Sequence, residues 1–470
     1  HQPATLKGRK NSAYSKFLLI LSNNTPVMPS ILIAPDKFKN TLAATEVADE
    51  IASVIRETMP DATIRICPMA DGGEGTAGIL ASHLSLQPAS ILGHDPMMNK
   101  AIIRYYESAD TCAVDCAAIV GLQMLSGSRR LTPWKATSYP LGEFINEMLS
   151  KGKQKIIIGL GGSATIDGGI GMLQALGAQF TDVDGEPIPA PICAESLSRI
   201  FSIDFSGMPR ADLARRIRIL ADVDLPLIPY GQNDTGLSSL SFAPQKGVAD
   251  SDIDTLANAL SNYIDAVDEA LYPPSNQPRF QGAAGGLGYA FHRVLRCPAS
   301  LGAEKIISMY NLFNPRPDLV ITGEGSFDNQ SFTGKATGTI CNHASSANTP
   351  AIVITGRSSI SKLPGNVTVL TTSPNPPVSS RNTNRTHHPD HTPTRQEALA
   401  NLRATLRKTL PPAIAASLQN PPAEPSTETP TTPPSATAST PPATPTHELS
   451  HKYFQTDIFK KTIKKIREKL

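Results

Sequence analysis

The chain is 470 residues long, which is too long for one compact core and sufficient for two domains with additional segments. Its 43 Lys and Arg residues nearly balance 41 Asp and Glu residues, so bulk charge gives no reason to expect nucleic acid or an anionic membrane as a partner. The sequence has no run of about 18 apolar residues, and we therefore expect no stable insertion into a membrane.

The six cysteines are scattered along the chain, and no C-x-x-C pair occurs among them. Disulfide frameworks are typical of short secreted chains, so we expect reduced thiols and a cytoplasmic location. No Cys or His pair has the spacing of zinc ligands.

The segment before the first strand shows no periodic pattern. Its apolar run at 17–21 is shorter than the roughly 7 residues of a signal peptide. The first methionine, Met28, lies directly before the first apolar strand. We expect residues 1–28 to be an extension outside the fold.

The next part of the chain alternates between strands and helices. Thr45 is expected to cap a helix in which apolar residues recur at helical spacing. Strands separated by such helices predict an α/β fold with parallel sheets. Several of the expected strands are nearly all apolar, as is typical of strands buried on both faces. The expected strands are residues 31–34, 63–67, 155–160, 218–220, 318–322 and 350–355.

The C-terminal part changes in composition. Thr394-x-x-Glu397 is a capping box for a helix whose leucines form one stripe between residues 399 and 410. Residues 419–449 are mostly Pro, Thr, Ser, Ala and Glu, and such a segment buries too little apolar surface to fold. Residues 450–470 predict a basic amphipathic helix, which could dock on a membrane surface or a partner, or could remain solvated.

Four segments beside predicted strands are rich in glycine, and three of them carry carboxylates. They are residues 68–76, 159–169, 282–288 and 322–328. Glycine lets backbone N–H groups approach a phosphate, and a following helix adds the positive end of its dipole. Asp and Glu offer hard oxygen ligands for Mg²⁺, and lysines offer point charges. Because ligands of open α/β sheets bind beyond the carboxyl ends of the strands, these segments predict an enzyme that handles phosphate and metal.

Two nucleotide-binding motifs bear on this prediction. No Walker A sequence is present, because Gly334-Lys335 is followed by Ala336 and lacks the first glycine. Gly159-x-Gly161-x-x-Ala164 loosely matches the Rossmann fingerprint and supports an alternative, an NAD-linked oxidoreductase. Against it, glycines 168 and 169 would break the helix that the fingerprint requires. A non-catalytic relative that acts through its tail is a third alternative.

Several longer motifs resemble those of the type-1 glycerate kinase family. They occur in family order and cover roughly residues 29–418. The resemblance implies a kinase that uses ATP and Mg²⁺ to phosphorylate D-glycerate, usually at the 2-hydroxyl, and it allows a homodimer. The motifs are residues 34–39, 68–76, 161–165 with 167–169, 221–224, 244–247, 282–288, and 321–325 with Asp328.

The resemblance also implies two α/β domains with the site between them. A Rossmann- or flavodoxin-like parallel-sheet domain would be built from residues 29–90 and 285–418. An inserted α/β domain would span residues 91–284. The disordered Pro/Thr/Ser-rich segment would follow this two-domain body.

The shared motifs identify the expected site residues. Asp71 and Glu74 are expected to bind metal or accept the glycerate proton, and Lys39 and Lys246 to pair with phosphate or the glycerate carboxylate. The expected metal ligands are Asp71, Asp222 and Asp224. The expected substrate- and nucleotide-binding residues are Asp36, Gly72, Gly73, Gly161, Gly162, Ser163, Thr165, Asp167, Gly285, Gly286, Gly323, Glu324, Asp328 and Lys335.

Some of these residues have structural alternatives. Asp36 could cap the turn before its helix, Asp222 or Asp224 could organise the turn at Pro226, and Lys335 could be solvated. The sequence departs from the family pattern at Asn40, Leu225 and residues 138–142, and none of these differences removes a charged motif residue.

Overall fold

The computed structural model describes residues 28–38, 41–125, 132–229, 238–271, 280–360, 362–372 and 394–419. Residues 1–423 form one compact unit, which contains all of these segments. The expected extension before Met28, the segment 420–449 and the expected basic helix at 450–470 lie outside the described residues.

The first sheet has five parallel strands in the order β13-β12-β11-β1-β2. Counted along the chain, this order is the 2-1-3-4-5 arrangement of flavodoxin-like sheets, whose ligands bind at the switch point between the first and third strands. Here the switch point lies between β1 and β11. The parallel α/β fold predicted from the apolar strands is confirmed. The strands are β1 (Ser30–Ile33), β2 (Thr63–Ile66), β11 (Leu319–Phe327), β12 (Ala351–Ser358) and β13 (Val367–Thr371).

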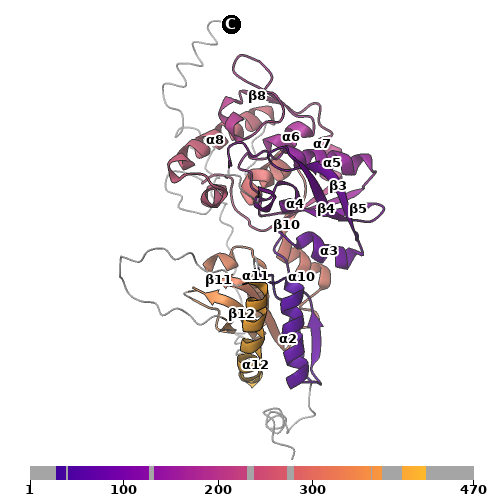
Figure 1. Ribbon diagram of the computed structural model, residues 1–470, viewed down its shortest axis with the longest axis vertical. Helices are drawn as coiled ribbons and strands as arrows, with labels where there is room; N and C mark the ends of the chain where they lie inside the picture. Colours follow the sequence, from indigo (N-terminus) through magenta and orange to yellow (C-terminus); the bar gives the residue numbers. More distant parts are fainter. Residues whose placement is uncertain are drawn as a thin grey trace, which may run out of the picture. The chain divides into compact units, whose positions relative to one another are not determined.

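Helices cover both faces of this sheet, because alternate side chains of its strands enter two separate cores. Ile31 and Ile33 pack with α2 (Ala44–Thr58) and α12 (Arg395–Gln419), which run side by side in Figure 1. Leu32 and Ala34 pack with α10 (Gly302–Tyr310) and α11 (Ala336–Ser346) on the other face.

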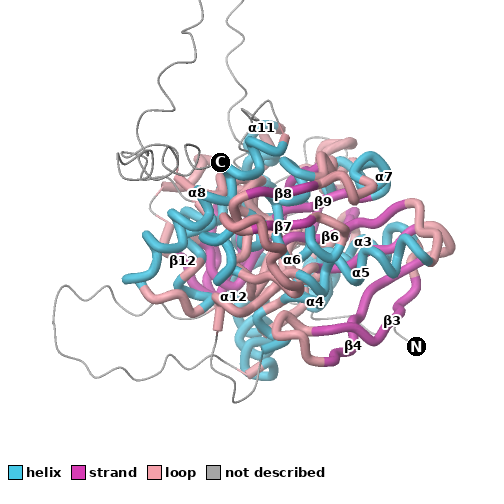
Figure 2. The backbone as a smooth tube through the Cα atoms, turned by 90° about the horizontal axis from the view of Figure 1, so that it is seen from above, coloured by secondary structure: helices cyan, strands magenta, loops and turns pink. Residues whose placement is uncertain are grey.

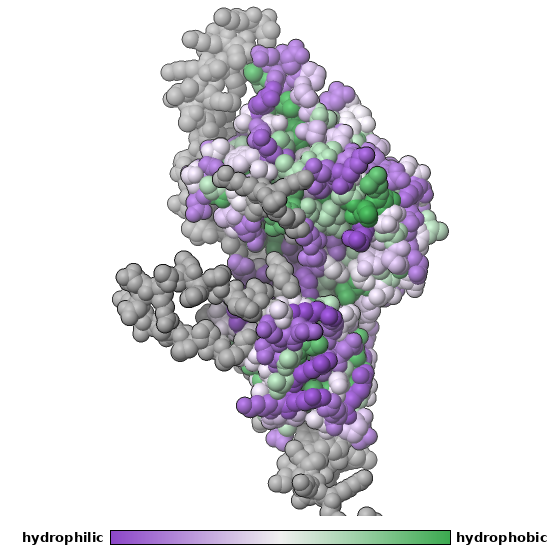
Figure 3. Space-filling model, in the orientation of Figure 1, coloured by the Kyte–Doolittle hydropathy of each residue, from purple (hydrophilic) through white to green (hydrophobic). Residues whose placement is uncertain are grey.

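The helix predicted from the capping box is confirmed as α12. The Thr394 backbone N–H donates to Glu397 Oε2 over 2.8 Å, and the leucine stripe is buried against the first sheet. Ion pairs join the outer surfaces of α12 and α2, where the hydrophilic surface dominates in Figure 3; they are Arg395–Glu46, Arg403–Glu50 and Arg407–Glu57.

The prediction that Thr45 caps α2 is wrong, because the N-cap residue is Ala43. The helix begins at Ala44, so Thr45 lies in the first turn and does not cap it. Glu46 provides the cap, because its Oε2 accepts the backbone N–H of Ala43 over 2.9 Å.

The second sheet has six strands in the order β10-β9-β6-β5-β4-β3. β10, β9, β6 and β5 are parallel, whereas β4 and β3 form an antiparallel hairpin that lies at the periphery in Figure 2. The strands are β3 (Gln87–His94), β4 (Lys100–Glu107), β5 (Thr111–Asp115), β6 (Lys155–Leu160), β9 (Ile217–Ala221) and β10 (Ala299–Leu301); β7 (Gln179–Thr181) and β8 (Ser202–Asp204) form a separate antiparallel pair.

This sheet is also covered on both faces. α3 packs on Ala113 and Ile157, and the opposite face packs against α5, α6 and α8. The helices in this part of the chain are α3 (Thr76–Leu84), α4 (Ala117–Val120), α5 (Tyr139–Ser150), α6 (Ile170–Ala175), α7 (Arg210–Arg216), α8 (Ile253–Ala270) and α9 (Leu287–Tyr289), with short helices at Leu122–Leu125, Ala194–Arg199, Ser239–Phe242, Pro244–Lys246, Asp250–Asp252, Ala283–Gly286, Ala290–Val294 and Asn329–Phe332.

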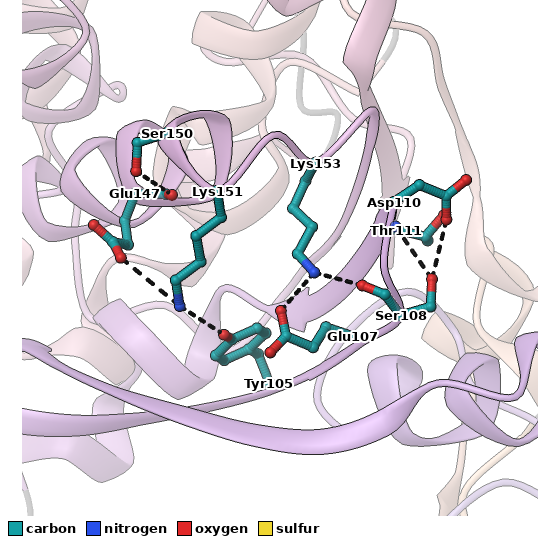
Figure 4. Close-up of polar contacts among 9 residues, drawn as sticks. All are labelled: Tyr105, Glu107, Ser108, Asp110, Thr111, Glu147, Ser150, Lys151 and Lys153. Atoms are coloured by element: carbon teal, nitrogen blue, oxygen red, sulfur yellow. Dashed lines mark hydrogen bonds and ion pairs between the residues drawn. The ribbon is translucent and has the colours of Figure 1, made fainter.

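A buried lysine joins the β4–β5 hairpin to the end of α5 (Figure 4). Lys153 Nζ lies 2.7 Å from Glu107 Oε2 and also donates to the carbonyl of Ser108. Lys151 Nζ donates to the hydroxyl of Tyr105 over 3.2 Å. These groups satisfy one another, so the network stabilises the fold and is not a binding site.

The strands divide between the two sheets slightly differently from the expected domain boundaries. Residue 90 falls inside β3, whose eight residues pair entirely with β4. β10 lies beyond residue 285 in the chain, yet it pairs with β9 of the second sheet. The first sheet does combine N-terminal and C-terminal strands around an inserted segment.

Candidate active site

A cavity of about 300 Å³ opens where strands of both sheets end. Its wall combines five carboxylates with three lysines. Such a concentration of charge in one concave site indicates a ligand that carries both phosphate and metal. The carboxylates are Asp36, Asp71, Glu74, Asp222 and Glu324, and the lysines are Lys37, Lys246 and Lys335.

The turn after β1 brings one acid and one lysine to the switch point. The Asp36 backbone N–H donates to the carbonyl of Gly323 over 2.8 Å, which joins this turn to β11. Burial and the nearby charge of Asp71 raise the pKa of Asp36 to about 8. Lys37 donates to the carbonyl of Glu74. Burial alone would lower the pKa of Lys37, but Asp71 and other carboxylates outweigh it, so the ammonium stays charged.

The loop after β2 carries Asp71 and Glu74. Asp71 Oδ1 accepts the backbone N–H of Gly73 over 2.9 Å, and the hydroxyl of Thr76 accepts the N–H of Gly72 over 3.1 Å. Gly72 has φ of 110°, and a Cβ there would lie 2.5 Å from the Ala221 backbone. The loop is therefore pressed against the end of β9 in the second sheet.

Asp115, at the end of β5, anchors this loop. Its carboxylate accepts the backbone N–H groups of Gly75 and Ala77, each over 2.8 Å. Both amides lie at the start of α3, where a negative charge is stabilised by the helix dipole. Burial nevertheless raises the pKa of Asp115 to about 6.

Asp115→Ala is expected to reduce both stability and activity. The loss of charge-assisted hydrogen bonds should lower the free energy of unfolding by about 2 kcal/mol, and displacement of the loop should lower kcat/KM at least about tenfold. Urea unfolding and steady-state kinetics measure the two effects. Asp115→Asn, which keeps one acceptor oxygen and the shape, should show smaller losses, and an Asp115→Ala enzyme with unchanged kcat/KM would contradict the anchoring role.

The glycine-rich segment at residues 322–328 lies mostly within strand β11 and does not follow the strand as a separate loop. β11 pairs with β12 as far as Phe327, whereas β1 ends at Ile33. Beyond Ile33, the backbone N–H groups of Ala34 and Asp36 continue to donate to β11, at Ile321 and Gly323. Glu324 follows Gly323 and faces the cavity from this extended strand.

Asp222 and Glu324 each present a buried oxygen with no hydrogen-bond partner among the described residues, Oδ1 in Asp222 and Oε1 in Glu324. Burial, followed by the charge of Asp71, raises the pKa of Asp222 to about 7. Burial likewise raises the pKa of Glu324 to about 7. Unpartnered buried carboxylate oxygens cost free energy unless a ligand or cation completes them.

The raised pKa values predict that the ligand-free protein becomes less stable as pH rises. Unfolded carboxyls titrate near pH 4, whereas those of Asp36, Asp222 and Glu324 titrate at about 8, 7 and 7 when folded. Between these values the folded state holds more protons, so the free energy of unfolding decreases from pH 5 to pH 8. Urea unfolding without metal or nucleotide measures this slope, which should be shallower in Asp36→Asn. A free energy of unfolding that increases over this range would contradict it.

Lys246 lies in the cavity wall and is only 6% exposed. Its ammonium donates to Ser163 Oγ over 2.9 Å and to the carbonyl of Thr165 over 2.8 Å. Burial lowers the pKa of Lys246 to about 8.

No group of three or more His, Cys, Asp or Glu side chains in the described part of the chain is arranged to hold a metal ion alone. Mg²⁺ commonly uses one or two carboxylates and takes its other ligands from water and substrate phosphates. The unpartnered oxygens of Asp222 and Glu324 fit this second kind of site.

The structure brings eleven of the expected site residues to the cavity wall. These are Asp36, Asp71, Gly73, Glu74, Gly162, Ser163, Asp222, Lys246, Gly285, Glu324 and Lys335. Lys39 lies outside the described residues.

Other expected site residues lie behind or beside the wall. Asp167 is buried and accepts from Ser138 and Gly169; Asp224 accepts the backbone N–H of Phe280; Asp328 caps the Asn329–Phe332 helix. Through these hydrogen bonds the three acids stabilise the local backbone. The remaining residues outside the wall are Gly72, Gly161, Thr165, Gly286 and Gly323.

Lys37, Asp115 and several wall residues, including Phe242, Gln245 and Gln330, were not predicted from the sequence as site residues. Lys37 lies in the motif at residues 34–39, and its position next to Asp36 is the signal that could have identified it. The signal for Asp115 is weaker: it is an acid at the end of a short apolar run, where a strand could end near the site.

The glycine-rich turn after β6 does not form a Rossmann phosphate loop. The next helix, α6, begins only at Ile170, after Gly168 and Gly169 with φ of 64° and 82°. The dinucleotide fingerprint needs a helix that opens directly from the glycines, so the structure disfavours the oxidoreductase alternative.

A model of the glycerate kinase family matches residues 31–373 of this chain. The chain belongs to the glycerate kinase family. It is similar to "Glycerate 2-kinase" of Escherichia coli K12, with 39% identity over 69% of this chain and 84% of that protein. It is also 34% identical to "Glycerate kinase" of Bacillus subtilis 168, over 69% of this chain and 84% of that protein.

A solved structure supports the same assignment. The crystal structure of a protein described as glycerate kinase 2 from Salmonella typhimurium LT2 matches with a TM-score of 0.65 and 32% identity. The match covers 84% of this chain and 99% of that one. Family membership identifies this chain as a kinase. None of the helices in the described ranges is long and apolar enough to span a bilayer.

Proposed function

We propose that this protein uses ATP and Mg²⁺ to phosphorylate the 2-hydroxyl of D-glycerate, yielding 2-phosphoglycerate. The convergence of five carboxylates and three lysines on one cavity carries the proposal. Phosphoryl transfer requires metal ligands, cations for the phosphate oxygens and an acceptor for the hydroxyl proton, and this wall offers all three. The relative named glycerate 2-kinase supports the choice of acceptor and of hydroxyl.

Asp222 and Glu324 are the residues best suited to hold the metal, because each has a buried oxygen without a partner in the described chain. When bound, Mg²⁺ offsets the negative charge of the phosphate oxygens during transfer. Asp71 is close enough to Asp222 to raise the pKa of that carboxyl.

Asp71 is the proposed acceptor of the glycerate hydroxyl proton. The Gly73 N–H fixes its Oδ1, and the flanking loop is anchored by Asp115. Lys37 and Lys335 approach the carboxylate cluster as point charges and would bind the phosphates. The protein therefore positions the reacting groups and supplies charge in a buried site, where electrostatic interactions are strong.

An assay of ADP release with and without D-glycerate tests the proposal. ADP formation should require both D-glycerate and Mg²⁺, fall to background with EDTA and return when Mg²⁺ is added in excess. A ³¹P NMR spectrum of the product should show 2-phosphoglycerate. Release of ADP that is independent of D-glycerate would refute D-glycerate as the phosphoryl acceptor. A 3-phosphoglycerate signal would refute phosphorylation at the 2-hydroxyl.

The proposed setting of this reaction is the cytoplasm. All six cysteines are unpaired, and all but Cys193 are buried. Free thiols of this kind agree with a reducing compartment.

A further inference from the structure

Lys246 differs from the other two lysines of the cavity in its surroundings. Its three ammonium N–H groups have two acceptors within the described chain, Ser163 Oγ and the Thr165 carbonyl. The third donor has no acceptor in that part of the molecule, and Lys246 faces the cavity. A buried ammonium with a spare donor requires an anionic or polar ligand to complete it.

Apart from Asp222 and Asp167, the groups beside Lys246 are neutral. Gly285 lies against the ammonium, since a Cβ at this position would be 2.7 Å from Lys246 Nζ and 1.9 Å from the Thr165 carbonyl. Ser163 adds a hydroxyl, and the backbone N–H groups of Gly162 and Ser163 donate to no acceptor within the described ranges. Together these groups form a compact set of donors around one positive charge.

Lys37 and Lys335 each lie near two or more carboxylates of the wall. Lys37 is close to Asp71, Asp36 and Glu74, and Lys335 acts on Asp222 and Glu324. A metal and the phosphates that it bridges belong where carboxylates and cations alternate. Lys246 also lies near two acids. It lowers the pKa of Asp222 more than Lys335 does, whereas Asp167 is occupied by Ser138 and Gly169. Asp222 is therefore the wall carboxylate that Lys246 shares with Lys335.

We infer that Lys246, with Ser163 and the amides at 162–163, binds the carboxylate of the acceptor and not a phosphate of the nucleotide. The inference rests on the proposed function and deepens it by assigning the residues that select the acceptor class. The cavity should then prefer short 2-hydroxycarboxylates to neutral polyols of the same size. Gly285 contributes indirectly, because any side chain there would displace the ammonium.

The test compares D-glycerate with its neutral amide, D-glyceramide, in Lys246→Met and in the matched variant Lys335→Met. The wild-type enzyme should prefer D-glycerate in kcat/KM by about 10- to 100-fold, the effect of a charged hydrogen bond. Lys246→Met should abolish most of this preference and leave the KM for ATP within about threefold of wild type. Lys335→Met should lose activity with both acceptors and retain the preference.

Other results would overturn the inference. If Lys246→Met keeps the preference, or if its KM for ATP rises while acceptor selectivity is unchanged, Lys246 serves the nucleotide. If Lys246→Met is inactive, calorimetry on that variant decides: loss of D-glycerate binding with ATP binding retained supports the inference, and the reverse refutes it. If the wild-type enzyme phosphorylates neither D-glycerate nor D-glyceramide, the proposed function is refuted. This outcome is distinct from the outcomes for Lys246→Met, which test only the role of Lys246.

A second variant tests the site if Lys246→Met does not fold. Ser163→Ala keeps the ammonium in place and removes one neighbour. It should raise the KM for D-glycerate about tenfold and leave the KM for ATP unchanged. An unchanged KM for D-glycerate together with a raised KM for ATP would contradict the inference.

Discussion

Asp71→Asn is expected to lower kcat for D-glycerate at least about 100-fold, the usual contribution of a positioned base. Asparagine preserves the shape and keeps an oxygen to accept the Gly73 N–H, so the loop should remain in place. What is lost is the negative charge, which acts on Asp36, Asp222 and Lys37. The substitution therefore separates charge from geometry at the centre of the cluster.

Steady-state kinetics and circular dichroism test this expectation together. Asp204→Asn provides a matched control, because Asp204 is exposed on β8, away from the cavity wall. The control should keep wild-type kcat. An Asp71→Asn protein that is folded and has near-normal kcat would exclude Asp71 as the proton acceptor.

Gly72→Ala is expected to abolish most of the activity and to destabilise the protein. The added Cβ would lie 2.5 Å from the Ala221 backbone, and φ of 110° is unfavourable for alanine. The loop must move away from β9, and displacement of the reacting groups by about 1 Å can cost about 100-fold in rate. Activity and the midpoint of thermal unfolding should both fall.

Gly75→Ala is the matched control within the same loop. Gly75 also has a positive φ, 93°, but its added Cβ would meet no atom within 4 Å. Only the conformational cost remains, about 1–2 kcal/mol. Gly75→Ala should therefore keep most of its kcat, and equal losses in the two variants would show that φ, and not contact with the second sheet, limits residue 72.

The central strands of the first sheet, β1, β11 and β12, could be predicted well from the sequence because they are mostly buried. Strands 31–34 and 350–355 appear in the structure as β1 and β12, shifted by a few residues. The β3–β4 hairpin was not predicted, because an edge hairpin is only half buried and its apolar pattern is weak. Leu92 is 70% exposed and Ile102 is 59% exposed in that hairpin.

The site was predictable as a set of residue types, but not as a geometry. Asp36 and Glu324 are separated by 288 positions in the chain, and adjacent parallel strands β1 and β11 bring them together. Conversely, Asp167 and Asp328 lie in glycine-rich motifs that resemble ligand loops, yet their carboxylates accept backbone N–H groups nearby. Local sequence cannot distinguish an acid that binds a ligand from an acid that stabilises its own turn.

The sequence by itself determined the fold class, the family and most of the charged residues that form the site, because apolar strands and glycine-acid motifs are local patterns. Only the tertiary structure decided which acids reach the cavity, since this depends on where neighbouring strands end. It also showed that Lys37 and Lys335 each lie near two or more carboxylates, whereas Lys246 is buried beside Asp222, Gly285 and Ser163. The local dielectric and neighbouring charges that govern these three lysines come from residues distant in the sequence, so their different roles arise only on folding.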